Sequence, residues 1–559
     1  MRRRFLALSL LLLPFPACND AIPNDATPND LLPTVALQDR VAFVEKNSHT
    51  AFLLDPTDKA LVPRMVSVGK APIAAVKRNG DANNQLLVLS SGDRGSAKDA
   101  PVAAQLQAID AVASVAPVTY TLASPFDGLA QSSDGGFVVL FHASSAQSSA
   151  NSALFNPNEL AIVNFNPQPA GSSLPNPYAK SIRSFGGVPN DVVFSPLFTF
   201  AGKSRTLAVV LAENYVTIVD LNNPDHSEIT VPLSPDGTSS FMPAQVLFDS
   251  DDPSTTANPK SYIYIRADGS NDIFQIALAD LGSAPPTSSS NDFRVSLSIL
   301  AAGTGPADMA LYGTGTAKRL AVAASASRTL VIIDPSTSST TSVPTSIPVN
   351  RIVRFDTTKP TVPTATTDEQ ALLVDVSNGS SNALFADLHT IETSGGIALT
   401  SYPLGSSAAS VVPLVDQGIA VLMLNQYGGS TALTVVDLAN RTFSPIGAGG
   451  QVGATAIETR APSRLWSIDA PYGLNYLNLV ARGSQARLAT SEIWLDQVIT
   501  SVIPFGWPSS DKPHYLAVGQ ADPNNVGNVT FLDADNPDRT TARTAYGFLL
   551  TNTLERGQP

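Results

Sequence analysis

The chain has 559 residues, of which 43% are hydrophobic and 14% charged, with 43 Pro and 36 Gly. This composition indicates many turns and still allows a buried core. The formal net charge of −13 argues against non-specific binding to nucleic acid and against docking on anionic lipid.

The N-terminus reads MRRRFLALSLLLLPFPACND. Three arginines precede an apolar run from Phe5 to Leu13, which is too short to span a bilayer comfortably. The run leads to Cys18, the only cysteine of the protein. This arrangement resembles a bacterial lipoprotein signal peptide, in which the cysteine is lipidated and becomes the new N-terminus. The resemblance implies a signal peptide over residues 1–17 and a membrane-anchored lipoprotein of the bacterial cell envelope, periplasmic or at the cell surface.

The signal departs from the lipoprotein pattern at Phe15, where leucine is usual, and at Pro16. The alternative is ordinary secretory cleavage near Ala17, with Cys18 incidental. A lone exported cysteine has no intramolecular partner, which favours lipidation. The sequence after it, NDAIPNDATPNDLLP, is rich in Pro, Asn and Asp. Residues 18–34 are therefore predicted to form a disordered spacer between the lipid and a folded body.

Short runs of β-branched and aromatic residues, bounded by turn residues, recur from about residue 35, as is typical of strands. Ten of them open units roughly 50 residues long, near residues 40, 85, 136, 205, 261, 318, 371, 418, 464 and 514. A second run follows in most units and ends in an aspartate: Asp55, Asp110, Asp220, Asp334, Asp387, Asp437 and Asp533. Two further runs complete each unit. Four strands at this period predict an all-β fold, a β-propeller of four-stranded blades over residues 35–550, followed by a C-terminal tail over 551–559.

Some units carry a V-G-x-x-P phrase before an inner strand, such as VGKAP at 68–72, and an apolar run closed by Asp. These features resemble the YVTN-type propeller repeats of bacterial and archaeal surface proteins, over about residues 35–550. The resemblance implies an architecture and leaves function open, because members of that family do different things. Few units carry the full motif, and the YVTN tetrapeptide is absent.

The number of units is high, because single propellers typically have four to eight blades. We expect about seven to ten blades and favour one ring over two. If there are two rings, residues 357–369 are the best candidate boundary. The last unit, from residue 514 onward, is expected to pair with the strands near 35–55 and so to close the ring.

Two acidic phrases, DLNNPDHSE at 220–228 and DADNPDRT at 533–540, are candidates for calcium loops or for turns. Calcium takes six to eight oxygens from a closely wrapped loop, usually with a glycine at the sharp bend. Both phrases have a proline there, and both begin at the aspartate that closes the second run in other units. They are therefore predicted to be turns. The Asp-Gly within 266–272 likewise predicts a hairpin turn.

No recognisable catalytic set is present. The five histidines are far apart, and the chain has neither a G-x-S-x-G sequence nor a phosphate loop. We assign no catalytic residue and no metal ligand from the sequence, and the only cofactor left open is calcium.

Aromatic residues are the better guide to a binding surface. Trp466 and Trp494 are expected to pack between blades, whereas other aromatic residues of the C-terminal region fall in predicted loops. The loops between second and third strands, and those leading from one blade to the next, share one face, and by analogy ligands of propellers bind there. The candidate ligand-binding residues are Asp268, Asp272, Asn425, Tyr427, Asp469, Tyr472 and Trp507.

The sequence thus favours a lipid-anchored propeller of the cell envelope that binds or scaffolds a protein, a peptide or a glycan, with the membrane as a partner through Cys18 and without nucleic acid. The alternative is a propeller enzyme, similar to a lactonase or a quinoprotein, with a calcium-assisted site at the channel mouth.

Overall fold

The computed structural model describes residues 30–546 apart from short internal stretches. These stretches are 94, 96–99, 113–114, 144–155, 168–173, 184–187, 201–202, 235–236, 238, 251–259, 282–286, 288, 314–317, 356–368, 377–384, 392–396, 415–417, 426–432, 438–441, 447–454, 459–462, 480–489, 510 and 522–526. Cys18, the predicted signal peptide and the predicted C-terminal tail lie outside the described residues. Within the described part of the chain, no helix has the length and apolar character needed to cross a membrane.

The described residues form ten four-stranded antiparallel sheets and one small hairpin. The first five sheets comprise β1 (Val35–Ala36), β2 (Val41–Glu45), β3 (Thr50–Leu54) and β4 (Arg64–Ser67); β5 (Pro72–Lys77), β6 (Gln85–Ser90), β7 (Gln105–Asp110) and β8 (Val118–Thr121); β9 (Gly128–Gln131), β10 (Phe137–Phe141), β11 (Glu159–Asn164) and β12 (Tyr178–Ser181); β13 (Pro189–Phe194), β16 (Leu207–Ala212), β17 (Tyr215–Asp220) and β18 (Ile229–Pro232); and β19 (Met242–Ser250), β20 (Ser261–Asp268), β21 (Asp272–Asp280) and β22 (Phe293–Ala301). The hairpin, β14 (Phe198–Phe200) and β15 (Lys203–Arg205), is inserted into the fourth sheet.

The other five sheets continue along the chain in the same way. They comprise β23 (Pro306–Tyr312), β24 (Arg319–Ala324), β25 (Thr329–Ile333) and β26 (Thr340–Pro344); β27 (Arg351–Phe355), β28 (Glu369–Val374), β29 (Phe385–Ile391) and β30 (Ile397–Pro403); β31 (Ala408–Leu414), β32 (Ile419–Leu424), β33 (Leu433–Asp437) and β34 (Thr442–Ile446); β35 (Thr455–Glu458), β36 (Ser463–Ala470), β37 (Gly473–Leu479) and β38 (Thr490–Trp494); and β39 (Val498–Gly506), β40 (His514–Ala521), β41 (Gly527–Asp533) and β42 (Arg543–Ala545), with a 3-10 turn η5 (Arg539–Thr541) before β42.

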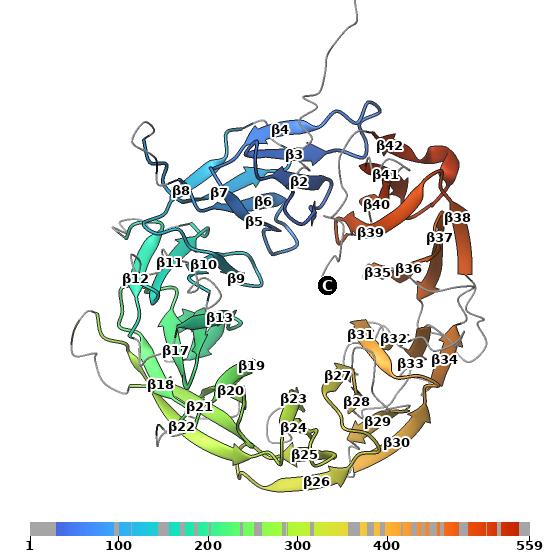
Figure 1. Ribbon diagram of the computed structural model, residues 1–559. Coiled ribbons are helices and arrows are strands. Elements are labelled where there is room, and N and C mark those ends of the chain that lie inside the picture. The colour runs from blue at the N-terminus through green and yellow to red at the C-terminus, as the bar shows by residue number, and fades with distance from the viewer. Residues whose placement is uncertain are drawn as a thin grey trace, which may run out of the picture.

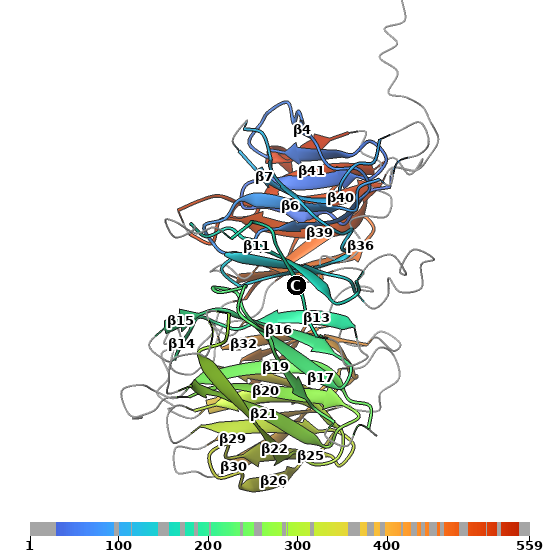
Figure 2. The same ribbon diagram turned by 90° about the vertical axis from the view of Figure 1, so that its left-hand side faces the viewer.

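The sheets are the blades of a single ring (Figure 1). In each blade the first strand lies nearest the ring axis and the fourth lies on the rim, and Figure 2 shows the same ring from its side. The predicted propeller with one ring is therefore confirmed, with ten blades. The segment 357–369 lies between β27 and β28, which pair within one blade, so it is not a boundary between two rings.

The ten apolar runs found in the sequence are the second strands of the blades, and they are buried because each face packs on a different neighbour. In β16, Leu207 and Val209 pack against the fifth blade, whereas Ala208 and Val210 pack against the third. Alternate side chains of a strand point to opposite faces of its sheet. A strand between two neighbouring blades must therefore be apolar at every position, which is the pattern read from the sequence.

The aspartates predicted to close strands do so in most blades. In five blades the Asp side chain accepts a hydrogen bond from the backbone N–H two residues later, with distances of 2.8 to 2.9 Å, at Asp55, Asp110, Asp220, Asp334 and Asp533. Asp437 also ends its strand, β33. The prediction is wrong for Asp387, which lies within β29 and is fully buried. Its carboxylate instead accepts hydrogen bonds from Ser346 and Ser401.

The V-G-x-x-P phrase leads into inner strands, as predicted: Pro72 and Pro306 are the first residues of β5 and β23. The residue before each proline adopts a positive φ, 51° at Ala71 and 66° at Gly305. This left-handed residue turns the chain from the rim of one blade to the axis of the next, and glycine adopts that conformation with the least strain.

The ring closes by packing rather than by strand pairing. The expectation that the last unit pairs with the first strands is wrong, because the tenth blade takes all four of its strands from β39 to β42. Its Phe505 and Phe531 pack instead on Val41, Phe43 and Leu54 of the first blade. A blade that is already complete has no need of a strand from the other end of the chain.

One polar contact recurs at two seams between blades. Arg64, at the start of β4, donates from Nη1 to the carbonyls of Asp110 and Ala111 in the next blade, at 2.9 and 3.2 Å. Arg543, at the start of β42, donates in the same way to the carbonyls of Pro56 and Thr57, at 3.1 and 2.9 Å. Each arginine thus fixes the rim strand of one blade to a turn of its neighbour.

Candidate functional site

The connections between strands emerge at two ends of the ring. Antiparallel order puts the turns between second and third strands at one end, together with the connections from each blade to the next; we name it the 2–3 end. The turns between first and second strands, and between third and fourth strands, lie at the opposite end, which we name the 1–2 end. This division sorts the residues predicted to bind a ligand.

Most of the predicted binding residues lie at the 2–3 end. Asp268 and Asp272 flank the turn between β20 and β21, Asn425 follows β32, and Tyr472 lies between β36 and β37, just after Asp469 at the end of β36. Trp507 differs, because it connects β39 to β40 at the 1–2 end. Tyr427 and the side chain of Asp469 lie outside the described residues.

The structure does not gather these residues into one cluster. Asp268 and Asp272 belong to the fifth blade, Asn425 to the eighth and Tyr472 to the ninth, and Figure 1 shows the fifth blade on a different side of the ring from the other two. Reasoning from sequence placed them on one face, yet distance around a ring of ten blades depends on the blade number, which the sequence left open.

The turn around Asp268 is the predicted Asp-Gly hairpin, with Gly269 at a φ of 89°. Asp268 is paired with Arg266 at 2.5 Å, and the hydroxyl of Ser270 accepts from the backbone N–H of Asp272 at 3.0 Å. Asn425 is likewise used by the fold, because its side-chain amide donates to Ser407 Oγ at 2.9 Å. These two positions hold loops in place.

A different arrangement surrounds Tyr472. Its side chain is 43% exposed, and Trp494, opposite Gly473 in the paired strands β37 and β38, is 51% exposed. Val498, the first residue of β39, is 40% exposed. These three exposed residues therefore lie at the 2–3 end, in segments of the ninth blade and the start of the tenth whose backbones are neighbours. We name Tyr472, Trp494 and Val498 the aromatic platform.

The backbone under the aromatic platform is fixed by hydrogen bonds between its two segments. The carbonyl of Tyr472 accepts from the N–H of Leu495 at 2.9 Å, and the carbonyl of Pro471 accepts from the N–H of Ile499 at 2.7 Å. The turn after β36 is thereby tied to the connection between β38 and β39. A platform held in this way loses little conformational entropy when a ligand binds.

A polar network anchors the same connection to the tenth blade. The side chain of Gln497 accepts from Asn528 Nδ2 at 2.5 Å, and its carbonyl accepts from Gln520 Nε2 at 3.2 Å. Gln520 and Asn528 are buried, and Thr530 Oγ1 donates to Gln520. The side chain of Asp496, between Trp494 and Val498 in the sequence, is 78% exposed and is paired with Arg539, so the platform has a charged edge.

The three tryptophans differ from one another in exposure. Trp466 is fully buried and packs on Tyr476, with 5.0 Å between ring centroids, as predicted. The prediction that Trp494 packs between blades is wrong: Trp494 is 51% exposed, whereas Ile493 and Leu495 on either side of it are buried against the tenth blade. Trp507 is half-buried, and its carbonyl accepts from Nε2 of the buried His514 at 2.6 Å. The sequence did place Trp494 at the end of the last apolar run of its unit, directly before the connection to the next blade, and this position could have indicated its exposure.

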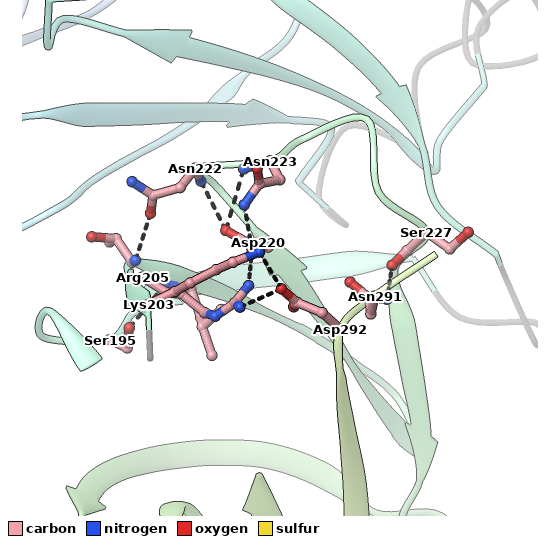
Figure 3. A network of polar contacts seen from close by, with 11 residues as sticks. Ser195, Lys203, Arg205, Asp220, Asn222, Asn223, Ser227, Asn291 and Asp292 are labelled. Atoms are coloured by element: carbon pink, nitrogen blue, oxygen red, sulfur yellow. Dashed lines mark hydrogen bonds and ion pairs between the residues drawn. The ribbon is translucent and has the colours of Figure 1, made fainter. Parts of the chain in front are cut away.

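The acidic phrase at 220–228 is a turn held by a buried ion pair (Figure 3). Arg205 and the side chain of Asp220 are both buried and meet at 2.8 Å, while Arg205 Nη2 also contacts Asp292 of the next blade at 2.7 Å. Lys203 pairs with the same Asp292 at 2.6 Å. Burial acts to raise the pKa of Asp292, but the hydrogen bonds and charges of Arg205 and Lys203 outweigh it and lower that pKa to about 2.

The later part of the same turn holds a cation of the protein itself. The ammonium of Lys180, from β12 of the third blade, donates to the carbonyls of Pro224 and His226 at 3.2 and 2.7 Å and lies 3.5 Å from Glu228. In this part of the phrase, two backbone carbonyls and the carboxylate of Glu228 thus face a lysine. Among the described residues, no group of three or more His, Cys, Asp or Glu side chains has the arrangement of a metal site.

Comparison with known proteins identifies no family. No family model matches the chain, and no curated protein matches it. Among solved structures, the chain is similar to the dihydro-heme d1 dehydrogenase NirN in complex with DHE, with 10% identity and a TM-score of 0.34, over 95% of this chain and 77% of that one.

Two further solved structures show a similar degree of likeness. One is Sqt1 of Saccharomyces cerevisiae, with 8% identity and a TM-score of 0.33, over 75% of this chain and 94% of that one. The other is apo AztD of Citrobacter koseri, with 12% identity and a TM-score of 0.30, over 67% and 94%. These similarities concern the fold alone.

Proposed function

We propose that the protein is a lipid-anchored propeller of the bacterial cell envelope, related in its repeats to the YVTN type, that binds a peptide or glycan of the envelope on the aromatic platform. The observation that supports a binding role is the exposed pair Tyr472 and Trp494 on a fixed backbone. Their rings offer flat apolar faces, and their O–H and N–H groups offer hydrogen bonds. Surfaces of this kind bind sugar rings and peptide side chains.

The anchor is tested by membrane fractionation. Wild-type protein should sediment with membranes, and a Cys18→Ala variant should appear in the soluble fraction, because one residue carries the lipid. A Cys18→Ala variant that still sediments with membranes would show that the anchor is wrong. The binding role does not depend on this result, since the platform belongs to the folded body.

The platform is tested with purified peptidoglycan sacculi, the glycan-peptide network of the envelope. Wild-type protein should sediment with sacculi, and a Tyr472→Ala, Trp494→Ala double variant should lose most of this binding, on the order of tenfold in affinity, because aromatic anchors dominate such surfaces. The matched control is Phe385→Ala, since Phe385 is 44% exposed on the seventh blade. Equal binding by all three proteins would contradict the assignment to the platform.

A further inference from the structure

The rim strand β22 of the fifth blade is longer than the other rim strands. It has nine residues, whereas the fourth strands of the other nine blades have three to seven. Figure 1 shows it on the outer edge of the ring. Short edge strands limit pairing with a second chain, because they offer few unpaired backbone groups. β22 lacks that protection.

Proline protects several of the other rim strands and is absent from β22. Four rim strands contain one, at Pro232, Pro344, Pro403 and Pro445. Residues 293–301 read FRVSLSILA, without proline, lysine or an acid, and Arg294 is their single charge. All nine residues pair with β21 in one register without a bulge. The strand therefore offers a long, regular edge, which is the form that accepts another strand.

The ladder between β21 and β22 shows which backbone groups of β22 point outward. Beyond one end of the ladder, the N–H of Leu281 donates to the carbonyl of Asp292 at 3.1 Å. Beyond the other end, the N–H of Ala302 donates to the carbonyl of Asn271 at 3.2 Å. Hydrogen-bonded pairs alternate along an antiparallel ladder. The even-numbered residues of β22 therefore bond to β21, and the odd-numbered residues turn their N–H and C=O groups to the rim.

The middle of this outer edge is apolar on one face and polar on the other. The outward backbone groups of Val295, Leu297 and Ile299 bond to no residue of the described part of the chain. The side chains of Val295 and Leu297 pack on the apolar cluster between the fourth and fifth blades, and Ile299, on the same face, is 51% exposed. Ser296 and Ser298 are exposed on the opposite face.

We propose that β22 pairs with β22 of a second copy of this chain, in antiparallel order about a two-fold axis at Leu297, so that two blades join in one sheet. In this register Val295 lies opposite the second copy's Ile299, and Leu297 lies opposite its own copy. The apolar faces of the two strands are then continuous, and Ser296 lies opposite the second copy's Ser298. Cross-strand pairs of these types stabilise antiparallel sheets.

Charge favours a copy of this strand in this register. Arg294 lies opposite the second copy's Leu300, so the two arginines stand at opposite ends of the new ladder. No acid lies within β22, although the chain has a net charge of −13, and Asp292 before it is paired with Arg205 and Lys203. Because the pairing occupies the edge of both copies, the assembly closes as a dimer and does not grow. This inference depends neither on the lipid anchor nor on the aromatic platform.

The register is tested by disulfide formation in the full-length chain with Cys18→Ala, in which an added cysteine is the one thiol. Ser296→Cys and Ser298→Cys proteins are purified separately, one with a tag that distinguishes it by mass, and mixed under mild oxidation. Positions 296 and 298 of two copies would lie with Cα atoms about 4.5 Å apart, which a disulfide can bridge. The mixture should therefore form a cross-linked heterodimer. Each protein alone should cross-link far less, because its cysteines would occupy diagonal positions roughly 7–8 Å apart.

The dimer itself is measured by sedimentation equilibrium of the Cys18→Ala chain without an added cysteine. We expect a reversible dimer that Leu297→Pro or Ile299→Lys weakens on the order of tenfold or more. Leu297→Pro removes an N–H that points outward, so the blade keeps its own hydrogen bonds and circular dichroism should stay unchanged. The matched control is Met65→Lys, at a position 69% exposed on the short rim strand β4, which should leave the dimer intact.

Three results would overturn the proposal. A Cys18→Ala chain that stays monomeric would leave the edge of β22 to a strand of another protein. A dimer that persists in both variants would place the interface elsewhere on the ring. Equal cross-linking in the mixture and in the separate proteins would contradict the two-fold register at Leu297.

Discussion

Arg543 and Pro56 lie 487 residues apart in the sequence, and Nη1 of Arg543 donates to the carbonyl of Pro56 at 3.1 Å. The contact joins the last rim strand to the first blade. Arg64 makes the same kind of contact between the first and second blades. The seam between the tenth and first blades is thus held by the same kind of contact as the seam between the first and second blades, which are consecutive in the chain.

An Arg543→Ala variant should loosen the closing seam. The guanidinium donates to two carbonyls of a partly exposed turn, so its loss should cost about 1 kcal/mol. Hydrogen exchange should become faster in β2, β3, β40 and β41 and stay unchanged elsewhere. Arg64→Ala is the matched control and should speed exchange in the first and second blades instead. Faster exchange all around the ring in both variants would show that the blades do not open separately.

The two similar acidic turns should respond differently to the same substitution. Asp220→Ala leaves Arg205 buried beside Asp292 without its second carboxylate, which should cost about 3–5 kcal/mol. Asp533→Ala removes only hydrogen bonds to the backbone N–H groups of Asp535 and Asn536, which should cost about 1 kcal/mol. Thermal unfolding followed by circular dichroism should rank the variants in this order. Equal losses would mean that the ion pair adds nothing to the turn.

Asp292 should contribute to stability in mildly acidic solution. Its pKa of about 2 in the folded protein is below the value of about 3.9 in an unfolded chain. The contribution, about 2 kcal/mol, is therefore present above pH 4 and is lost as the pH falls towards 2. An Asp292→Asn variant should be less stable at pH 6 and should lose less stability between pH 4 and pH 2. Unfolding by urea at each pH measures the difference, and parallel pH curves would contradict it.

Calcium should not stabilise the protein. In the turn at 220–228, Asp220 is paired with Arg205, and the carbonyls of Pro224 and His226 accept from Lys180. Of the acids predicted at the 2–3 end, Asp268 and Asp272 share the fifth blade and Asp469 belongs to the ninth. Purified protein should contain no stoichiometric metal, and added calcium should leave the unfolding temperature unchanged. A rise in unfolding temperature that Asp268→Asn abolishes would favour the alternative, an enzyme with calcium at the channel mouth.

Local sequence patterns predicted the blades because the burial of a strand and the turn after it are visible in the residue types of that segment itself. A second strand such as β10 (Phe137–Phe141) is buried on both faces, so five apolar residues in a row identify it. The aspartate after a strand binds the backbone two residues later, so Asp55 and Asp334 could be placed from the sequence. Asp387 followed the same pattern of letters but is bound by Ser346, in the connection before β27, and by Ser401 of β30, which the sequence around it does not show.

The candidate site was harder to predict because it depends on contacts between blades. Tyr472 was found from its loop, but Trp494 was assigned to the core because tryptophans in strands usually pack. Its exposure follows from the alternation of β38, which turns Ile493 and Leu495 toward the tenth blade and Trp494 away from it. Likewise, nothing in the acidic phrase at 220–228 indicates that Lys180 of another blade donates hydrogen bonds to its carbonyls.

No blade draws its strands from both ends of the chain, because each is one contiguous stretch. The structure of the ring therefore does not depend on which blade comes first in the chain. A circular permutant that joins the present ends and opens between β22 and β23 should build the same ten blades. Its N-terminus would then lie at β23 of the sixth blade, and its C-terminus at β22 of the fifth. The position of the chain ends therefore decides which blades carry the two termini and leaves the blades themselves unchanged.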